Sequence, residues 1–124
     1  MHYLNKYMVR FGDAVMFDID DTLIRSSDGM IIFPMVDVLL HAKSRGYQII
    51  LITARPRLQE VVDYTVQQMF ELGIPYDELG FCDARDKGRL KLELGYTFVL
   101  SVGDLDTDLT HTRHGLNTST FHHF

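Results

Sequence analysis

Short apolar runs alternate with helix-length segments along most of this 124-residue chain. The runs are short enough to be buried strands, and the segments between them carry apolar side chains at the three- and four-residue spacing of a helix. Strands that alternate with helices form βαβ units, so the pattern predicts an α/β fold with a doubly wound, mostly parallel sheet. The expected strands span residues 14–18, 47–53, 79–83 and 97–102, and the expected helices span residues 34–45, 58–72 and 87–94.

The residues that follow the segments agree with these boundaries. Gly46, Gly73 and Gly95 come directly after the three expected helices, where a residue in the left-handed conformation commonly ends a helix. After Leu105 the pattern predicts a short helical stretch, followed by a last small strand at Thr118 to Phe121.

Length and composition limit the classes of protein to consider. The chain has room for one domain, which we expect to span residues 1–124. A net charge of −5, from 12 basic and 17 acidic residues, argues against a basic surface that coats nucleic acid. Cys82 is the single cysteine, so no intramolecular disulfide can form, which favours a reducing compartment. With no apolar segment of signal-peptide or membrane-span length, we expect a soluble cytoplasmic protein without membrane contact.

Thirteen of the 17 acidic residues are aspartates, and several of them follow expected strands. Asp18 and Asp20 come at the end of the first strand, Thr53 ends the second, and Asp104 and Asp108 follow the strand at 97–102. Ligands of open α/β sheets bind at the carboxyl ends of the strands, so we expect these side chains to lie together. Clustered carboxylates repel one another unless a cation intervenes, and hard oxygen ligands suit Mg²⁺.

Two lysines, Lys87 and Lys91, precede the strand at 97–102 and share one face of the short helix before it. An ammonium group and the hydroxyl group of Thr53 suit the oxygens of a transferring phosphoryl group. Together with the aspartates, these groups predict Mg²⁺-assisted phosphoryl transfer in which an aspartate is the nucleophile.

Residues 17–23, Phe-Asp-Ile-Asp-Asp-Thr-Leu, resemble the first motif of the haloacid dehalogenase (HAD) superfamily, which is Asp-x-Asp-x-Thr after a strand. Residues 50–53 resemble its second motif, an apolar run that ends in threonine or serine, and residues 102–109 resemble its fourth. A lysine upstream of the fourth motif supplies the third. The motifs occur in the family's order and cover residues 14 to 110. Residues 86–109 look closest to the small acid phosphatases and their plant storage-protein relatives.

The resemblance implies a role for each aspartate of these motifs. Asp18 would be the nucleophile and a Mg²⁺ ligand. Asp20 would protonate the leaving oxygen, then activate water, and would ligate Mg²⁺ through its backbone carbonyl. Asp104 would complete the metal site, and Asp108 would position the lysine or hold a metal-bound water. Since relatives that lack the second aspartate tend to be ATPases or dehalogenases, Asp20 favours a phosphatase or a phosphomutase.

The second and third motifs supply the remaining site residues. The resemblance implies that Thr53 binds the phosphoryl oxygens. Lys87 is favoured over Lys91 as the site lysine, because it lies at the start of its helix and nearer to the strand ends. Arg55 is either a substrate contact or a member of a surface ion pair, and the sequence leaves both readings open.

Other functions fit parts of the sequence less well. A signalling receiver has a similar size and residue set, but its acceptor aspartate stands between the acidic pair and the threonine, an order that this chain lacks. A catalytically weak phosphate-ester binding or storage protein on the same fold would be expected to lose its nucleophile, and Asp18 is present. A second metal site at His111 and His114 is not favoured, since no carboxylate or cysteine has the matching spacing.

No interval of the chain can hold the cap domain that selects small substrates in this superfamily. About a dozen residues lie between Thr22 and Pro34, and one helix and one strand fit between Pro56 and Lys87. An open site would accept a bulky phosphorylated end, or a neighbouring subunit of a homo-oligomer would cover it. The sequence Thr-Ala-Arg-Pro at 53–56 also occurs in relatives that dephosphorylate nucleotides or polynucleotide ends. Nucleic acid is thus considered as a substrate only, beside phosphoproteins.

Overall fold

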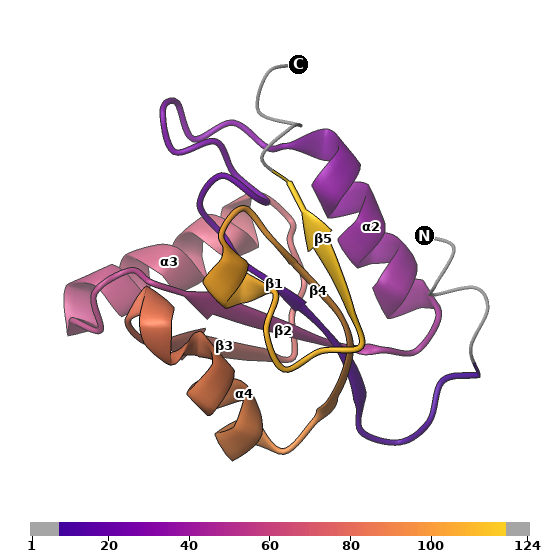
Figure 1. Ribbon diagram of the computed structural model, residues 1–124. Helices are drawn as coiled ribbons and strands as arrows, with labels where there is room; N and C mark the ends of the chain where they lie inside the picture. Colours follow the sequence, from indigo (N-terminus) through magenta and orange to yellow (C-terminus); the bar gives the residue numbers. More distant parts are fainter. Residues whose placement is uncertain (1–7, 119–124) are drawn as a thin grey trace.

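Five parallel strands form one sheet, in the order β3-β2-β1-β4-β5, in this computed structural model, which describes residues 8–118 (Figure 1). The strands are β1 (Asp13–Phe17), β2 (Gln48–Thr53), β3 (Glu78–Phe81), β4 (Thr97–Gly103) and β5 (His114–Asn117). The helices are α2 (Phe33–Ser44), α3 (Gln59–Glu71) and α4 (Lys87–Leu94), with short 3₁₀ turns at η1 (Ala84–Asp86) and η2 (Asp106–Asp108). The predicted α/β fold with a parallel sheet is confirmed.

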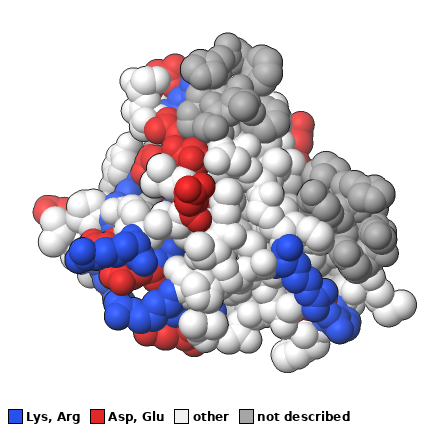
Figure 2. All heavy atoms as spheres, viewed as in Figure 1, with Lys and Arg blue, Asp and Glu red and all other residues white. Residues whose placement is uncertain are grey.

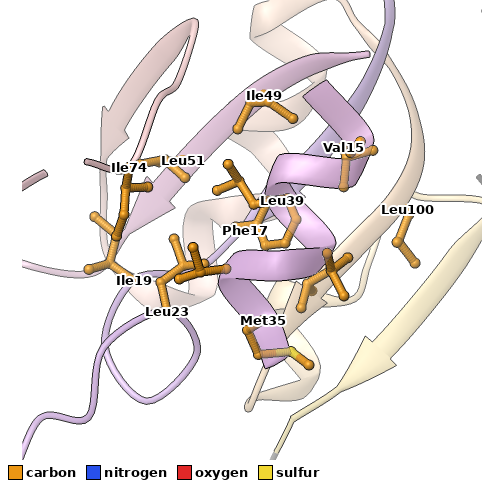
Figure 3. Packing of buried hydrophobic residues seen from close by; sticks show 14 of the residues in the cluster. Val15, Phe17, Ile19, Leu23, Met35, Leu39, Ile49, Leu51, Ile74 and Leu100 are labelled. Carbon is orange, nitrogen blue, oxygen red and sulfur yellow. The ribbon is translucent and has the colours of Figure 1, made fainter. Parts of the chain in front are cut away.

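Helices cover both faces of the sheet. Successive side chains of a strand point to opposite faces, and the apolar side chains on each face of β1 pack against a helix. Val15 and Phe17 of β1 belong to the larger apolar cluster with Leu39 of α2, which Figure 3 shows lying over the sheet. Met16 belongs to the second cluster, against which Leu90 of α4 packs. The helices α2 and α4 accordingly lie on opposite sides of the sheet (Figure 1), and the sheet is doubly wound as predicted.

The strand order brings the carboxyl ends of β1 and β4 together. β1 pairs with β2 on one side and with β4 on the other, so the connections run in opposite directions away from β1. In open α/β sheets, ligands bind in the crevice at such a reversal. The backbone N–H of Asp18 donates to the carbonyl of Val102 at 2.9 Å. This bond continues the pairing with β4 and sets the first aspartate beside the end of that strand.

The two intervals in which a cap domain could be inserted are short. Residues 18–32 join β1 to α2 as a loop, in which Ile24 forms isolated bridges with Asp20 and with Ile31. The helix α3 and its flanking turns join β2 to β3. Residues 8–118 therefore contain no cap domain, as predicted, and the site edge of the sheet stays open. In the same part of the chain, no helix is long and apolar enough to cross a membrane.

The last strand differs from the prediction. β5 spans His114–Asn117, and Thr118, the first residue of the predicted strand, follows it; residues 119–121 lie outside the described part of the chain. Leu116 is the apolar side chain of β5 and packs against the larger cluster. One apolar residue in four gives no alternating pattern, and β5 forms because its backbone pairs with Leu100–Gly103 of β4.

Candidate active site

Asp18 lies just beyond β1 and is joined to Lys87, the first residue of α4. Its Oδ1 accepts a hydrogen bond from Nζ of Lys87 at 2.9 Å. The lysine side chain is 1% exposed, and its Nζ also donates to Oδ1 of Asp108 at 2.5 Å. Of the two lysines considered from the sequence, Lys87 is the one whose ammonium group the fold brings to these carboxylates.

Asp108 is held by the turn η2 and by the close approach of a glycine. Its Oδ2 accepts the backbone N–H of Leu105 at 3.1 Å, while Oδ1 faces Lys87. A Cβ atom added to Gly103 would collide with both Cβ and Oδ2 of Asp108. Glycine at the end of β4 therefore leaves room for the buried carboxylate of Asp108. That carboxylate contacts Lys87, which fits the role implied for Asp108 of positioning the lysine.

Asp18, Asp104 and Asp108, here called the acidic triad, offer carboxylate oxygens that all lie within 4.8 Å of one another. Burial raises the pKa of Asp18 from 3.8 to about 7, with Lys87 opposing the shift and Asp108 adding to it. Burial also raises the pKa of Asp104. Burial by itself would lower the pKa of Lys87, but Asp18 and Asp108 outweigh it and raise the pKa.

The acidic triad holds three carboxyl groups, of which Asp18 and Asp108 pair with the one ammonium group of Lys87, so the triad carries more acidic groups than Lys87 can balance. A cation relieves that repulsion, and clustered carboxylate oxygens are the donors that hard divalent cations take. The acidic triad could therefore hold a metal ion, which agrees with the metal site implied for Asp18, Asp104 and Asp108. The metal contact expected from the backbone carbonyl of Asp20 stays a prediction.

The raised pKa of Asp18 predicts how the stability of the metal-free protein depends on pH. Between pH 3.8 and about 7, the folded protein holds a proton on Asp18 that the unfolded chain has lost. The contribution of this group to the free energy of unfolding should therefore fall as the pH rises through that window. We expect the difference between wild type and Asp18→Asn, from urea denaturation in EDTA, to decline across it. A flat or rising difference would contradict the buried, poorly neutralised state of Asp18.

Asp20, the predicted acid/base, lies at the rim of the site and outside the acidic triad. Its side chain is 40% exposed, and both carboxylate oxygens accept hydrogen bonds from Arg55, from Nε at 3.0 Å and from Nη2 at 2.9 Å. Arg55 is therefore in an ion pair, but its own side chain is only 13% exposed, so this is not the surface pair considered from the sequence. Its Nη1 donates to Thr65 and Gln68 of α3, contacts that no motif in the sequence indicates.

An open pocket of about 280 Å³ lies between these groups. Thr53, the last residue of β2, does not line the pocket; it is buried, and its Oγ1 accepts the backbone N–H of Arg55 at 3.1 Å. Asp21 adopts a positive φ of 61°, and its carboxylate accepts hydrogen bonds from the backbone N–H and the hydroxyl group of Ser26. The pocket is lined by Asp18, Asp20, Asp21, Ala54, Arg55, Lys87, Asp104 and Leu105.

The surface around the pocket carries charges of both signs. Figure 2 shows acidic side chains over η2 and basic side chains over η1 and α4 beside them. Arg85 pairs with Asp83 at 3.8 Å, and Arg89 pairs with Asp86 at 3.2 Å. Arg85 and Arg89 are thus each paired with a neighbouring acid.

Lys91, one helical turn after Lys87, ties α4 to the segment that follows Asp108. Its Nζ donates to Oγ of Ser101 at 3.0 Å and to the carbonyl oxygens of Asp108 at 2.6 Å and Thr110 at 2.7 Å. Burial lowers the pKa of Lys91 to about 8, although the charge of Asp108 opposes the shift. The second lysine therefore supports the site from outside it.

We expect Lys91→Met to lower the free energy of unfolding by roughly 2–3 kcal/mol, because three acceptors, two of them buried, lose their donor. Chemical denaturation in EDTA measures the change. Arg89→Met, on the same helix but with a 70% exposed side chain, is the matched control and should change stability by less than about 1 kcal/mol. Equal effects of the two substitutions would show that Lys91 does not fasten this segment.

Of the two histidines considered for a second metal site, His111 follows η2 and His114 is the first residue of β5. His111 packs against α4, where a Cβ atom on Gly88 would collide with its Nδ1. Within residues 8–118, the acidic triad is the group of metal-ligand side chains that the fold brings together, and it includes neither His111 nor His114.

The sheet order, the absence of a cap in the described residues and the acidic triad at the β1–β4 reversal define a HAD-like domain with a candidate metal site. More narrowly, the chain belongs to the LNS2 domain family, because residues 15–96 match the family described as "PITM 1-3, LNS2 domain". No curated protein sequence matches the chain significantly.

Two solved structures contain a chain with a similar fold. One is the Pnkp1/Rnl/Hen1 complex, in which 25% of the aligned residues are identical and the TM-score is 0.63. The other is the Pnkp1/Rnl/Hen1 RNA repair complex, with 26% identity and a TM-score of 0.60. Each alignment covers 77% of this chain but only 40% and 37% of the matched chains. The chain thus spans about two fifths of the proteins that it resembles.

Proposed function

We propose that this protein is a Mg²⁺-dependent phosphomonoesterase that acts through an aspartyl-phosphate on Asp18. The observation that carries the proposal is the arrangement of Asp18, whose Oδ1 is held by Lys87 in a pocket that Asp20 and Asp104 also line. A nucleophile, a cation for phosphoryl oxygens and an acid/base thus border one open space.

The acidic triad and the backbone carbonyl of Asp20 would hold Mg²⁺. When bound, Mg²⁺ supplies positive charge that neutralises the phosphoryl oxygens and lets an anionic ester approach the carboxylates. The fit rests on the donor set itself, which has hard oxygens within 4.8 Å of one another and more negative charge than Lys87 balances.

Different residues of the chain would act as nucleophile, as acid/base and as hydrogen-bond donors to the phosphoryl group. One carboxylate oxygen of Asp18 attacks phosphorus, the bond from phosphorus to the ester oxygen breaks, and Asp20 gives its proton to that leaving oxygen. Lys87 donates a hydrogen bond to the phosphoryl oxygens. The same contact from Thr53 requires its buried hydroxyl group to turn toward the pocket, which it does not line in this structure. In the second step Asp20 takes a proton from water as the water oxygen attacks phosphorus, which releases phosphate and restores both carboxyl groups.

The open pocket supports a substrate that is large beyond its phosphate group. The similarity to a chain of an RNA repair complex, together with the Thr-Ala-Arg-Pro sequence at 53–56, supports a nucleotide or polynucleotide end over a phosphoprotein. The balanced charges of Arg85 and Arg89 fit recognition of an end and not of a long strand. Within the superfamily, residues 86–109 support a place near the small acid phosphatases. We also propose that a second copy of the chain covers the pocket when the substrate is small.

A substrate panel tests the proposal. We expect Mg²⁺-dependent release of phosphate from an aryl phosphate, and faster release from a 3′-phosphorylated oligonucleotide or a mononucleotide than from a phosphopeptide or a sugar phosphate. EDTA should abolish the release. Equally poor hydrolysis of the mononucleotide and the oligonucleotide would remove the preference for nucleic acid ends. No release from any ester, with tight binding retained, would favour the alternative of a phosphate-ester binding or storage protein.

A further inference from the structure

Arg55 connects the rim of the candidate active site to helix α3. On one side its Nε and Nη2 donate to the two carboxylate oxygens of Asp20, at 3.0 and 2.9 Å. On the other side its Nη1 donates to Oγ1 of Thr65 and to Oε1 of Gln68, both at 2.9 Å. The guanidinium group therefore lies in a fixed plane between the proposed acid/base and one helix.

The number of donors on Arg55 limits what else it can do. A guanidinium group has five N–H bonds in a rigid planar arrangement. Four of them have acceptors in this structure, two on Asp20 and one each on Thr65 and Gln68. One N–H of Nη2 is left for a substrate oxygen, so Arg55 cannot grip a phosphoryl group with two parallel bonds while this arrangement lasts.

The helix side of the connection is well ordered. Thr65 is fully buried, and its hydroxyl group donates to the carbonyl of Val61 at 2.8 Å, which turns its lone pairs toward Arg55. Gln68 follows one turn later on the same face and offers its side-chain carbonyl oxygen. Both acceptors come from a helix whose Met69 is packed in the larger apolar cluster, so they are set by the core.

We propose that Thr65 and Gln68 are positioning residues, which hold Asp20 through Arg55 at the place where it can pass its proton to the leaving oxygen. This inference rests on the proposed phosphatase function. The backbone at Asp20 is held by a bridge to Ile24, but the Asp20 side chain is 40% exposed, so burial alone does not fix its rotamer. Two bonds from a guanidinium plane that α3 holds restrict that choice before the substrate arrives.

A misplaced proton donor should slow two aryl phosphates to different extents, whereas a general loosening of the fold would slow both equally. A phenolate with an electron-withdrawing group leaves without a proton, whereas the less acidic phenol of phenyl phosphate needs one. Misplacing the proton donor should therefore slow phenyl phosphate more than p-nitrophenyl phosphate, which has nearly the same shape. The comparison uses kcat/KM, which reports steps up to departure of the leaving group and excludes hydrolysis of the phosphorylated protein.

The variants are Gln68→Met and Thr65→Val, which keep side-chain size and remove the acceptor for Arg55. With saturating Mg²⁺, we expect kcat/KM for phenyl phosphate to fall about 10-fold or more, with the change mainly in kcat, and that for p-nitrophenyl phosphate to fall less than about 3-fold. Gln68→Glu keeps an acceptor oxygen and should retain most of the activity. Gln67→Met is the matched control, since Gln67 is exposed on the same helix and bonds to Glu71.

The outcomes separate this inference from the function on which it rests. Equal losses on both esters, or no loss in either variant while wild type is active, would overturn the positioning role and leave the phosphatase standing. Wild-type protein that hydrolyses neither ester would overturn the proposed function and the positioning role with it. Thermal unfolding of each variant shows whether α3 remains folded, and Gln68→Met carries the test if Thr65→Val is unstable.

Discussion

Asp18→Asn is expected to lower Mg²⁺-dependent hydrolysis of phosphate esters by at least about 10³-fold, while the protein stays folded. Asparagine has the shape of aspartate but cannot form the acyl phosphate, so the effect falls on the chemical step. The side-chain carbonyl of asparagine can still accept the hydrogen bond from Lys87, which preserves the local packing. Steady-state phosphate release, with saturating Mg²⁺ and an aryl phosphate, measures the loss.

Asp106→Asn is the matched control for this prediction. Asp106 is an exposed aspartate in η2, close in sequence to Asp104 and Asp108, and it belongs neither to the acidic triad nor to the pocket lining. It should keep wild-type activity to within about 3-fold. Activity that survives Asp18→Asn would place the nucleophile elsewhere.

Lys87→Met should have the largest effect on stability. The ammonium group is 1% exposed and bonds to both Asp18 and Asp108, so its removal leaves buried carboxylates without a counter-charge. We expect the free energy of unfolding in EDTA to fall by roughly 3–5 kcal/mol, the cost of breaking a buried ion pair. Part of that loss should return when Mg²⁺ is added, because a cation bound to the folded state stabilises it by mass action.

Urea denaturation with EDTA and with Mg²⁺ tests this prediction. Lys43→Met serves as the control, since Lys43 is half exposed and its contact with Asp77 is 4.0 Å long. That control should change stability by less than about 1 kcal/mol and should not respond to Mg²⁺ differently from wild type. A stable Lys87→Met protein without metal would mean that the triad is protonated and needs no counter-charge.

The fold class was predictable because the alternation of short apolar runs with amphipathic segments is a local property of the sequence. Short apolar runs between amphipathic segments predicted a parallel sheet covered on both faces, and four of the five strands lie within a few residues of their predicted places. The exception is β5, whose single apolar residue Leu116 provides no pattern. Pairing with β4 determines that strand, and such pairing is a tertiary property.

The positions of the triad residues followed from motif spacing. Asp18 and Asp104 stand at the ends of strands that become neighbours, so any parallel sheet in this order brings them to one edge. The choice of Lys87 over Lys91 used the same reasoning, and the structure places the Lys87 ammonium group between Asp18 and Asp108. Lys91 has a separate role in binding backbone carbonyls, which spacing alone does not indicate.

The network around Arg55 was beyond the reach of the sequence. Thr65 occurs at the helical spacing of the apolar residues on α3, which predicts a buried position but no polar role. Whether its hydroxyl meets an arginine depends on how α3 rotates against the end of β2, and the packing of Met69 and its neighbours sets that rotation. The one indication in the sequence was the pair Thr65 and Gln68, a polar residue among apolar ones on α3 and a glutamine three residues later.

The most direct test of the account is to trap the phosphorylated protein. Asp20→Asn should slow hydrolysis of the aspartyl-phosphate, because the residue that activates water is lost, while p-nitrophenyl phosphate still delivers its phosphoryl group. Acid quenching with Mg²⁺ present, followed by borohydride, reduces an acyl phosphate to an alcohol that peptide mapping locates. We predict homoserine at position 18, none in EDTA and none after Asp18→Asn. An unmodified Asp18 during demonstrated turnover, or a modification at a different residue, would contradict the central claim.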